Sequence, residues 1–141
     1  MYHREEPNVD PEVCRAIIKA MRIPLRRRGE SYRPTDFMHT RDICRPLLVD
    51  RFPGDWTGCS LMIVFADGGR IDPHCDENMK LVTWVRRHLV LQTNPEALAT
   101  HDGYQQHLEL GGVYQMDPRV EHSSVNHGMT DRIHLYVDQH V

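Results

Sequence analysis

The stretch "DPRVEHSSVNHGMTDRIHLYVD", residues 117–138, decides the fold class of this chain. The apolar positions of its last seven residues are Ile133, Leu135 and Val137. This period of two is typical of a strand that lies against a core on one face. We therefore predict a strand over 132–138. Its opposite face would carry Arg132, His134 and Tyr136.

A second strand is predicted just upstream, over 122–126. The intervening segment NHGMTD contains Asn, Gly and Asp, which suit a turn. The two strands could therefore form an antiparallel hairpin, with His122 roughly opposite Arg132. In that register the two side chains would share a face, with their Cβ atoms about 5 Å apart.

The rest of the chain after Pro53-Gly54 continues as short β-rich runs separated by Gly, Pro, Asn and Asp. The further runs cover residues 59–66, 69–75, 81–93, 105–110 and 113–117. About seven strands in about eighty residues favour a β-sandwich or barrel, with helices packed on one outer face.

The N-terminal third is predicted to be helical. A helix over 10–21 could be capped by Asp10 and has Pro11 at its first position. A second, short helix would occupy part of 40–51, where Pro46 allows only a start or a kink. At 141 residues the chain is about one domain long. We therefore expect one domain over 1–141, with a helical segment over 1–57 packed on a β core over 58–141.

Composition excludes several classes of protein. The chain is 40% hydrophobic and 26% charged, and no apolar run approaches the ~20 residues of a membrane span. A net charge of −3 gives no general attraction to nucleic acid or to an anionic membrane. The N-terminus shows no secretory signal, and the four cysteines form no CxxC pair. We expect a soluble cytoplasmic protein, in which the basic run 26–28 is solvated surface.

The segment "IDPHCDEN", residues 71–78, places His74 and Asp76 two positions apart. On a strand such residues project from one face, near enough to share a metal ion. Chance alone predicts 10 × 20/141, about 1.4, cases of a His followed two positions later by Asp or Glu, and the chain has three. The others are His3/Glu5 and His107/Glu109. The pair therefore needs further support.

That support comes from His122 and Arg132. Two imidazoles and a carboxylate on one face of an octahedron form the triad of non-haem Fe(II) oxygenases. A guanidinium nearby suits a bidentate grip on a carboxylate of a second ligand. The combination points to an iron site that uses a dicarboxylate cosubstrate.

At this point the order HxD, distal His, and Arg ten residues later resembles the Fe(II)/2-oxoglutarate-dependent dioxygenases. More narrowly, "VRRHLVLQTNP" (85–95) followed by "GGVYQMDPRVEHSSVNHGMTDRIHLYVD" (111–138) resembles the aspartyl/asparaginyl β-hydroxylase superfamily, which includes small-molecule prolyl hydroxylases. The resemblance covers residues 60–138. It implies a mainly β fold, the cupin-like double-stranded β-helix or jelly roll, behind the N-terminal helices.

The resemblance also implies roles for particular residues. The iron ligands, and hence the catalytic centre, would be His74, Asp76 and His122. Arg132 would bind the distal carboxylate of 2-oxoglutarate, and His88 and Arg86 match cosubstrate-binding positions. Some members of the superfamily lack the acidic ligand, so Asp76 places this chain nearer the members with a full triad, including hydroxylases of free amino acids.

The implied activity is hydroxylation of an unactivated C–H bond, with O2 and 2-oxoglutarate consumed and succinate and CO2 released. The implied substrate is a small molecule, a free amino acid in the first place and a peptide side chain in the second. Two rivals remain: a cupin-like metalloenzyme of another reaction type and a non-catalytic metal-binding jelly roll. The closely spaced HxH pair of cupins is absent.

Several other residues have two interpretations. An edge strand with a polar side accounts for His107 and Glu109, because no Arg follows ten residues later. Trp84 and Tyr136 are candidates for the pocket wall. The segments 22–39 and 95–104 are candidate lid or substrate elements. By alternation, Cys75 should point away from the two proposed ligands beside it.

Overall fold

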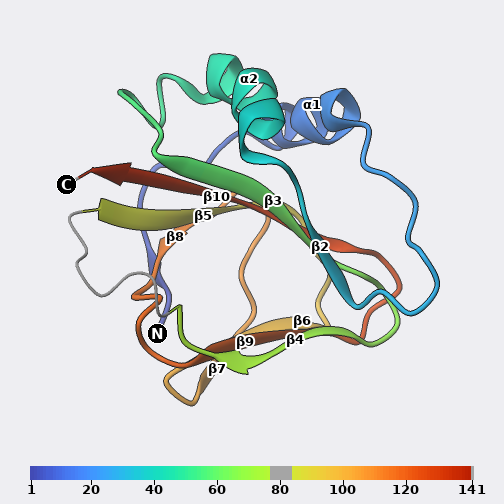
Figure 1. Cartoon of the computed structure of the whole chain (residues 1–141). Helices are drawn as coiled ribbons and strands as arrows, with labels where there is room; N and C mark the ends of the chain where they lie inside the picture. The colour runs from blue at the N-terminus through green and yellow to red at the C-terminus, as the bar shows by residue number, and fades with distance from the viewer. Residues whose placement is uncertain (77–83, 141) are drawn as a thin grey trace.

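The computed structural model of the chain describes residues 1–76 and 84–140, and two antiparallel sheets lie face to face in it (Figure 1). The larger sheet contains, in spatial order, β1 (His3–Arg4), β8 (Val113–Gln115), β5 (Trp84–Gln92), β10 (Arg132–His140), β3 (Gly58–Val64) and β2 (Tyr32–Pro34). The smaller sheet contains β4 (Gly69–His74), β9 (His122–Asn126), β6 (Ala97–His101) and β7 (Tyr104–Gln106). This is the predicted double-stranded β-helix, and the predicted fold class is confirmed.

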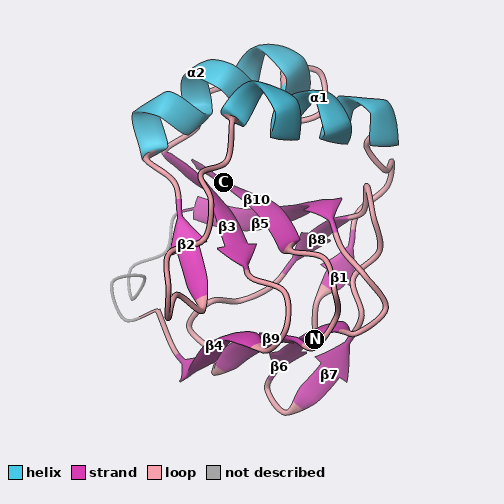
Figure 2. Cartoon of the chain, turned by 90° about the vertical axis from the view of Figure 1, so that its right-hand side faces the viewer, coloured by secondary structure: helices cyan, strands magenta, loops and turns pink. Residues whose placement is uncertain are grey.

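The two helices, α1 (Pro11–Met21) and α2 (Phe37–Leu48), cover the outer face of the larger sheet (Figure 2). Both begin at an aspartate that accepts a backbone hydrogen bond: Asp10 from Glu12 N at 2.8 Å, and Asp36 from His39 N at 3.0 Å. These caps satisfy amide groups that the first turn leaves without a partner. Neither helix of the described residues is long and apolar enough to cross a membrane.

The main hydrophobic core lies between the helices and the larger sheet. Its members on α1 and α2 include Cys14, Ile17, Met21, Cys44 and Leu48. The sheet contributes Leu61, Ile63, Leu89, Leu91, Ile133, Leu135 and Val137. The apolar face predicted for β10 is therefore the outer one, against the helices, and its polar face is turned to the space between the sheets. This division leaves the interior of the β-helix free for a polar site.

The predicted hairpin between the strands at 122–126 and 132–138 is wrong. β9 pairs with β4 and β6 in the smaller sheet, while β10 pairs with β3 and β5 in the larger one. The segment between them crosses from one sheet to the other. Asn126, fully buried, shapes this crossing: its side chain donates to Val64 O at 3.0 Å and to Thr130 O at 2.9 Å.

The other predicted elements have observed counterparts, with shifted ends. The first helix matches its prediction. The second begins at Phe37, three residues before the predicted stretch, and continues through Pro46 to Leu48. The strand predicted over 81–93 corresponds to β5, and its residues 81–83 lie outside the described residues. The sequence analysis missed the short strands β1 and β2, which lie at the two edges of the larger sheet.

The strand β6 lies within 95–104, the segment predicted as a candidate lid or substrate element. Residues 97–101 instead pair with both β9 and β7 inside the smaller sheet. A segment hydrogen-bonded on both sides is part of the scaffold, so the lid interpretation of 95–104 is wrong. The other candidate segment, 22–39, contains β2 and the start of α2.

Candidate functional site

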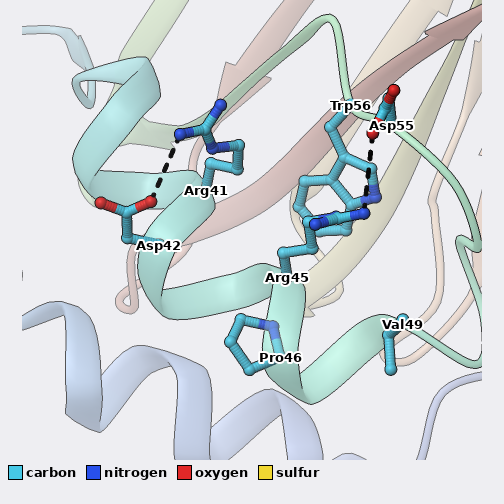
Figure 3. Close-up of a pocket in the computed structure, with 7 residues that line it drawn as sticks. All are labelled: Arg41, Asp42, Arg45, Pro46, Val49, Asp55 and Trp56. Atoms are coloured by element: carbon cyan, nitrogen blue, oxygen red, sulfur yellow. Dashed lines mark ion pairs between the residues drawn. The ribbon is translucent and has the colours of Figure 1, made fainter.

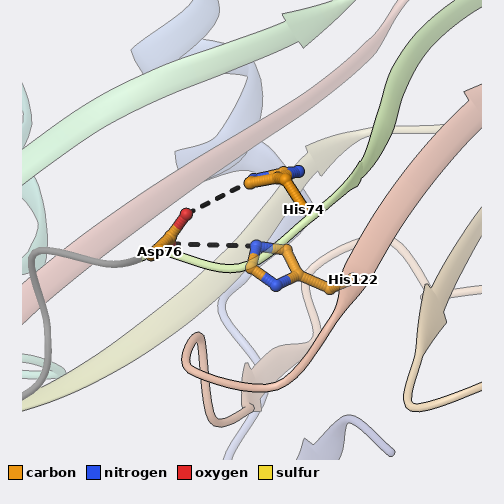
Figure 4. Close-up of side chains that lie close together, drawn as sticks. All are labelled: His74, Asp76 and His122. Atoms are coloured by element: carbon orange, nitrogen blue, oxygen red, sulfur yellow. Dashed lines mark ion pairs between the residues drawn. The ribbon is translucent and has the colours of Figure 1, made fainter.

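Three side chains from two segments of the chain meet between the sheets: His74 at the end of β4, Asp76 just beyond it, and His122 at the start of β9 (Figure 4). His74 and His122 are direct partners in the β4–β9 ladder. Asp76 Oδ1 lies 3.3 Å from His74 Nε2, and its Oδ2 lies 3.8 Å from His122 Nε2. One donor atom from each residue lies within 4.8 Å of the others.

Both imidazoles are oriented by the backbone. His74 Nδ1 lies 2.8 Å from Asp72 O, and His122 Nδ1 lies 2.8 Å from Val120 O. A carbonyl oxygen can only accept, so each Nδ1 donates to its carbonyl, and in a neutral imidazole of this tautomer Nε2, on the side of Asp76, is the nitrogen with the lone pair. Burial lowers the pKa of His122, although the bond to Val120 and the charge of Asp76 oppose it. In their neutral form, imidazoles that the backbone orients in this way are suited to bind a metal ion through Nε2.

Arg132 lies at the start of β10, buried to 5% exposure. Its guanidinium donates to Ser124 Oγ at 3.2 Å and to Met62 O at 3.3 Å, and lies 3.2 Å from His134 Nδ1. Its Nε has no hydrogen-bond partner, and among the described residues no carboxylate pairs with it. Burial lowers the pKa of Arg132 to about 10. A buried cation without a counter-ion is costly, so this position calls for an anion.

Two further histidines lie beside Arg132. Both ring nitrogens of His88 are buried without a partner in the described part of the chain. Burial, with the nearby Arg86 and Arg132, holds the pKa of His88 well below its usual value. His134 is shifted in the same direction by burial and by Arg132. Both imidazoles are therefore neutral, and the unsatisfied nitrogens of His88 are free to bond to a ligand.

Arg86, on β5, is held by two carboxylates. Its Nε and Nη2 donate to Oδ1 and Oδ2 of Asp138 at 2.8 and 3.0 Å, and its Nη1 donates to Asp76 Oδ2 at 3.0 Å. The guanidinium lies 4.2 Å from the ring centroid of Tyr136. Burial alone would lower the pKa of Arg86, but the hydrogen bonds from Arg86 to Asp138 and the negative charge of Asp138 raise it. Arg86 is thus a fixed cation in contact with the His-Asp-His cluster.

A cavity of about 200 Å³ joins these groups. It is lined by His74, Asp76, Arg86, His88, His122, Arg132 and Tyr136, together with Tyr2, Tyr32, Met62, Ile71, Met116, Ser123 and Ser124. All six residues proposed from the sequence therefore face one space. Tyr136 belongs to its wall, whereas Trp84 lines a different hollow. Tyr32 brings the segment 22–39 to the cavity.

Sequence reasoning missed two residues with polar roles here, Ser124 and Asp138. A signal for Asp138 was present, since it continues the period of two through Arg132, His134 and Tyr136 onto the polar face of β10. Ser124 shares the face of His122 by the same period of two, but its contact with Arg132 joins strands of different sheets and has no signal in the sequence.

The other candidates lie away from the cluster. His107 Nδ1 bonds to Ala97 O at 3.1 Å, and Glu109 pairs with Arg4 at 3.0 Å, so both have structural partners. His127, Cys75 and the basic run 26–28 are exposed. A larger hollow of about 890 Å³ lies beside α2 and carries the ion pairs of Arg41 with Asp42 and of Arg45 with Asp55 (Figure 3). It shares no residue with the cavity between the sheets.

The fold and this constellation define a class: a cupin-like double-stranded β-helix with two histidines and one carboxylate clustered between its sheets. Residues 47–140 match the sequence profile of the aspartyl/asparaginyl beta-hydroxylase family, and the chain belongs to that family. The predicted family is thereby confirmed.

Among curated proteins, the chain is 35% identical over 68 residues to an L-proline cis-4-hydroxylase of Rhizobium meliloti (strain 1021). The match spans 48% of this chain but only 24% of that enzyme.

Among solved structures, a non-heme monooxygenase in a nickel complex, ThoJ, has a TM-score of 0.60 at 14% identity, over 97% of this chain and 73% of the other. A Pseudomonas putida prolyl-4-hydroxylase has a TM-score of 0.56 at 15% identity, over 99% of this chain and 92% of the other. At these identities the likeness establishes a shared fold.

Proposed function

We propose that this protein is an Fe(II)- and 2-oxoglutarate-dependent dioxygenase that hydroxylates an unactivated C–H bond of a free amino acid. The balanced reaction converts the substrate, 2-oxoglutarate and O2 into the hydroxylated substrate, succinate and CO2. The observation that carries the proposal is Arg132, a buried guanidinium without a carboxylate partner among the described residues, in the same cavity as the His-Asp-His cluster.

The residues of the cluster fit a divalent iron ion. Nε2 of His74, Nε2 of His122 and one carboxylate oxygen of Asp76 would hold it, the donor set of non-haem Fe(II) oxygenases. When bound, iron and 2-oxoglutarate supply the activation of O2. The chain supplies two imidazoles that Asp72 O and Val120 O already orient.

Arg132 and His88 fit the cosubstrate. A guanidinium presents parallel N–H groups that match a carboxylate, and the burial of this one strengthens the attraction. An anion bound to Arg132 would compensate the buried positive charge of its guanidinium. The unpartnered nitrogens of His88 offer a second polar contact in the same cavity. A dicarboxylate could therefore extend from Arg132 toward the cluster.

The cavity suits a small substrate with an aliphatic C–H bond. Its apolar lining includes Met62, Ile71 and Met116, which would exclude water from the reacting carbon. The matching proline hydroxylase also supports an amino acid as substrate. A peptide side chain is the alternative, and parallel assays with free amino acids and short peptides distinguish the two.

An anaerobic titration tests the proposal. Fe(II) and 2-oxoglutarate are added to wild type, His122→Ala and His107→Ala, and the weak visible charge-transfer band of the chelate is recorded. We expect the band in wild type and in His107→Ala, whose imidazole bonds to Ala97 O outside the cluster. His122→Ala should lose it. Identical spectra for wild type and His122→Ala would refute the proposal.

The same titration separates the rival functions. A non-catalytic jelly roll predicts no iron-dependent spectral change. A cupin-like enzyme of another reaction type predicts a metal-dependent change that does not require 2-oxoglutarate. Succinate produced under air, and stimulated by one amino acid over others, would identify the substrate.

A further inference from the structure

The strongest feature not used by the proposed reaction is the buried carboxylate of Asp138. It lies at 5% exposure, directly opposite Arg86 in the β5–β10 ladder. Both its oxygens accept from Arg86, at 2.8 and 3.0 Å. This fork-to-fork pairing fixes the plane of the guanidinium as well as its position. The Tyr136 ring, 4.2 Å from that guanidinium, limits its movement on one face.

Asp138 binds two nitrogens of Arg86, Nε and Nη2. Because the guanidinium is planar and rigid, these two bonds also determine where Nη1 points. That nitrogen donates to Asp76 Oδ2 at 3.0 Å. The other oxygen of Asp76, Oδ1, lies 3.3 Å from His74 Nε2. Arg86 therefore occupies Oδ2 of the carboxylate, which also lies 3.8 Å from His122 Nε2, and leaves Oδ1 without a bond to a guanidinium on the side of His74. A carboxylate restricted in this way can give a metal ion one donor and leave other coordination positions open.

We propose that Asp138 is a positioning residue that acts through Arg86 on the metal ligand Asp76. The proposal rests on the proposed function, because Asp76 matters here as a ligand. It assigns to Asp138 no contact with substrate or cosubstrate. Its effect is to hold the guanidinium in the one orientation that restrains Asp76, which should tighten metal binding.

Gly58 gives independent support and a second way to disturb Asp138. It lies opposite Asp138 in the β3–β10 ladder, and a Cβ atom at Gly58 would lie 2.6 Å from Asp138 Oδ2. The carboxylate of Asp138 therefore occupies the space that a side chain at position 58 would need. Gly58→Ala should therefore displace the carboxylate of Asp138 without removing its charge.

The test measures the affinity for Mn(II), a redox-stable stand-in for Fe(II), by calorimetry without 2-oxoglutarate. The variants are Asp138→Asn, Gly58→Ala and the control Glu5→Gln. The control makes the same acid-to-amide change at the partner of the neighbouring Arg87, which Glu5 contacts at 2.6 Å. Thermal midpoints are recorded for all of them, so that loss of folding is not mistaken for loss of affinity.

We expect about 10- to 100-fold weaker Mn(II) binding in Asp138→Asn and in Gly58→Ala, the effect typical of losing a group that orients a ligand. Glu5→Gln should bind as wild type does. The proposal is overturned if the folded Asp138→Asn or Gly58→Ala protein keeps wild-type affinity. Gly58→Ala decides the matter should Asp138→Asn not fold.

A metal-independent measurement separates this proposal from the proposed function. In a crystal structure of metal-free Asp138→Asn, we expect the guanidinium of Arg86 to leave its wild-type orientation. The hydrogen bond from Arg86 Nη1 to Asp76 Oδ2 should lengthen or be lost. An unmoved Arg86 would refute the positioning role. Wild-type protein without His122-dependent Mn(II) binding would instead refute the proposed function, and the crystal structure would still decide whether Asp138 orients Arg86.

Discussion

Replacing Arg132 with methionine should leave the stability of the ligand-free protein nearly unchanged and strongly weaken its response to 2-oxoglutarate. Methionine keeps the length of the apolar stem and removes the charge. The stability should be nearly unchanged because the guanidinium is buried without a counter-ion among the described residues, so that removing its charge offsets the loss of its hydrogen bonds. A merely structural arginine would show loss of stability alone.

The magnitude follows from the cost of burial. Burial lowers the pKa of Arg132 from its ordinary 12.5 to about 10, and each pH unit between these values is worth about 1.4 kcal/mol. The charged form therefore costs about 3 kcal/mol. Removing it also leaves Ser124 Oγ, Met62 O and His134 Nδ1 without their contacts, at about 1 kcal/mol each. The two terms nearly cancel, so the free energy of unfolding without ligand should change by no more than about 1 kcal/mol, or a few degrees in thermal midpoint.

The assay is thermal unfolding with Mn(II), with and without 2-oxoglutarate under anaerobic conditions. At 100 times its dissociation constant the ligand should stabilise wild type by about 2.7 kcal/mol. Arg132→Met should bind it at least about 30-fold more weakly, because a desolvated charge pair is lost. Arg87→Met is the control, since Arg87 pairs with Glu5 outside the cavity. A variant that loses 2 kcal/mol without ligand, or that keeps the wild-type response, would contradict this reasoning.

Two further predictions concern stability. The buried His88 and His134 have pKa values well below 6.5, so the unfolded chain takes up their protons first. The free energy of unfolding is therefore highest above pH 6.5, where both histidines are neutral in the folded and the unfolded chain. It decreases as the pH falls below 6.5 toward the pKa values of the folded state. Urea unfolding of metal-free protein should show a loss of about 1 kcal/mol for each of these histidines between pH 6.5 and 5.5, and His134→Gln should reduce the total loss by about that amount; a flat profile would exclude this account. Asn126→Ala should cost about 3 kcal/mol, because Val64 O and Thr130 O lose their buried donor, and a loss below 1 kcal/mol would show that the crossing between the sheets does not depend on this amide.

Local patterns in the sequence predicted the elements well where short-range physics decides them. The Asp10 cap and Pro11 determine where α1 begins. The alternation at Ile133, Leu135 and Val137 determines which face of β10 meets the core. These features depend only on neighbours a few residues away, so they can be recognised without knowing the fold.

The wrong prediction of a hairpin between 122–126 and 132–138 shows that local sequence patterns do not determine which strands pair. The turn residues between His122 and Arg132 allow the chain to reverse, but a reversal within one sheet and a crossing between two sheets have the same local signature. The choice was made by long-range pairing of β9 with β4 and β6, and by the bonds of Asn126 to the opposite sheet. His122 and Arg132 still face one cavity, from different sheets.

The sequence by itself determined the chemical groups of the candidate site and their order along the chain, because motif spacing and residue type carry that information. Only the tertiary structure decided that Arg132 is buried without a carboxylate partner in the described residues, that backbone carbonyls orient both histidines, and that Asp138 holds Arg86 against Asp76. The physical reason is that burial and hydrogen-bond geometry arise where strands from two sheets meet, and no local stretch of sequence contains both sides of such a contact.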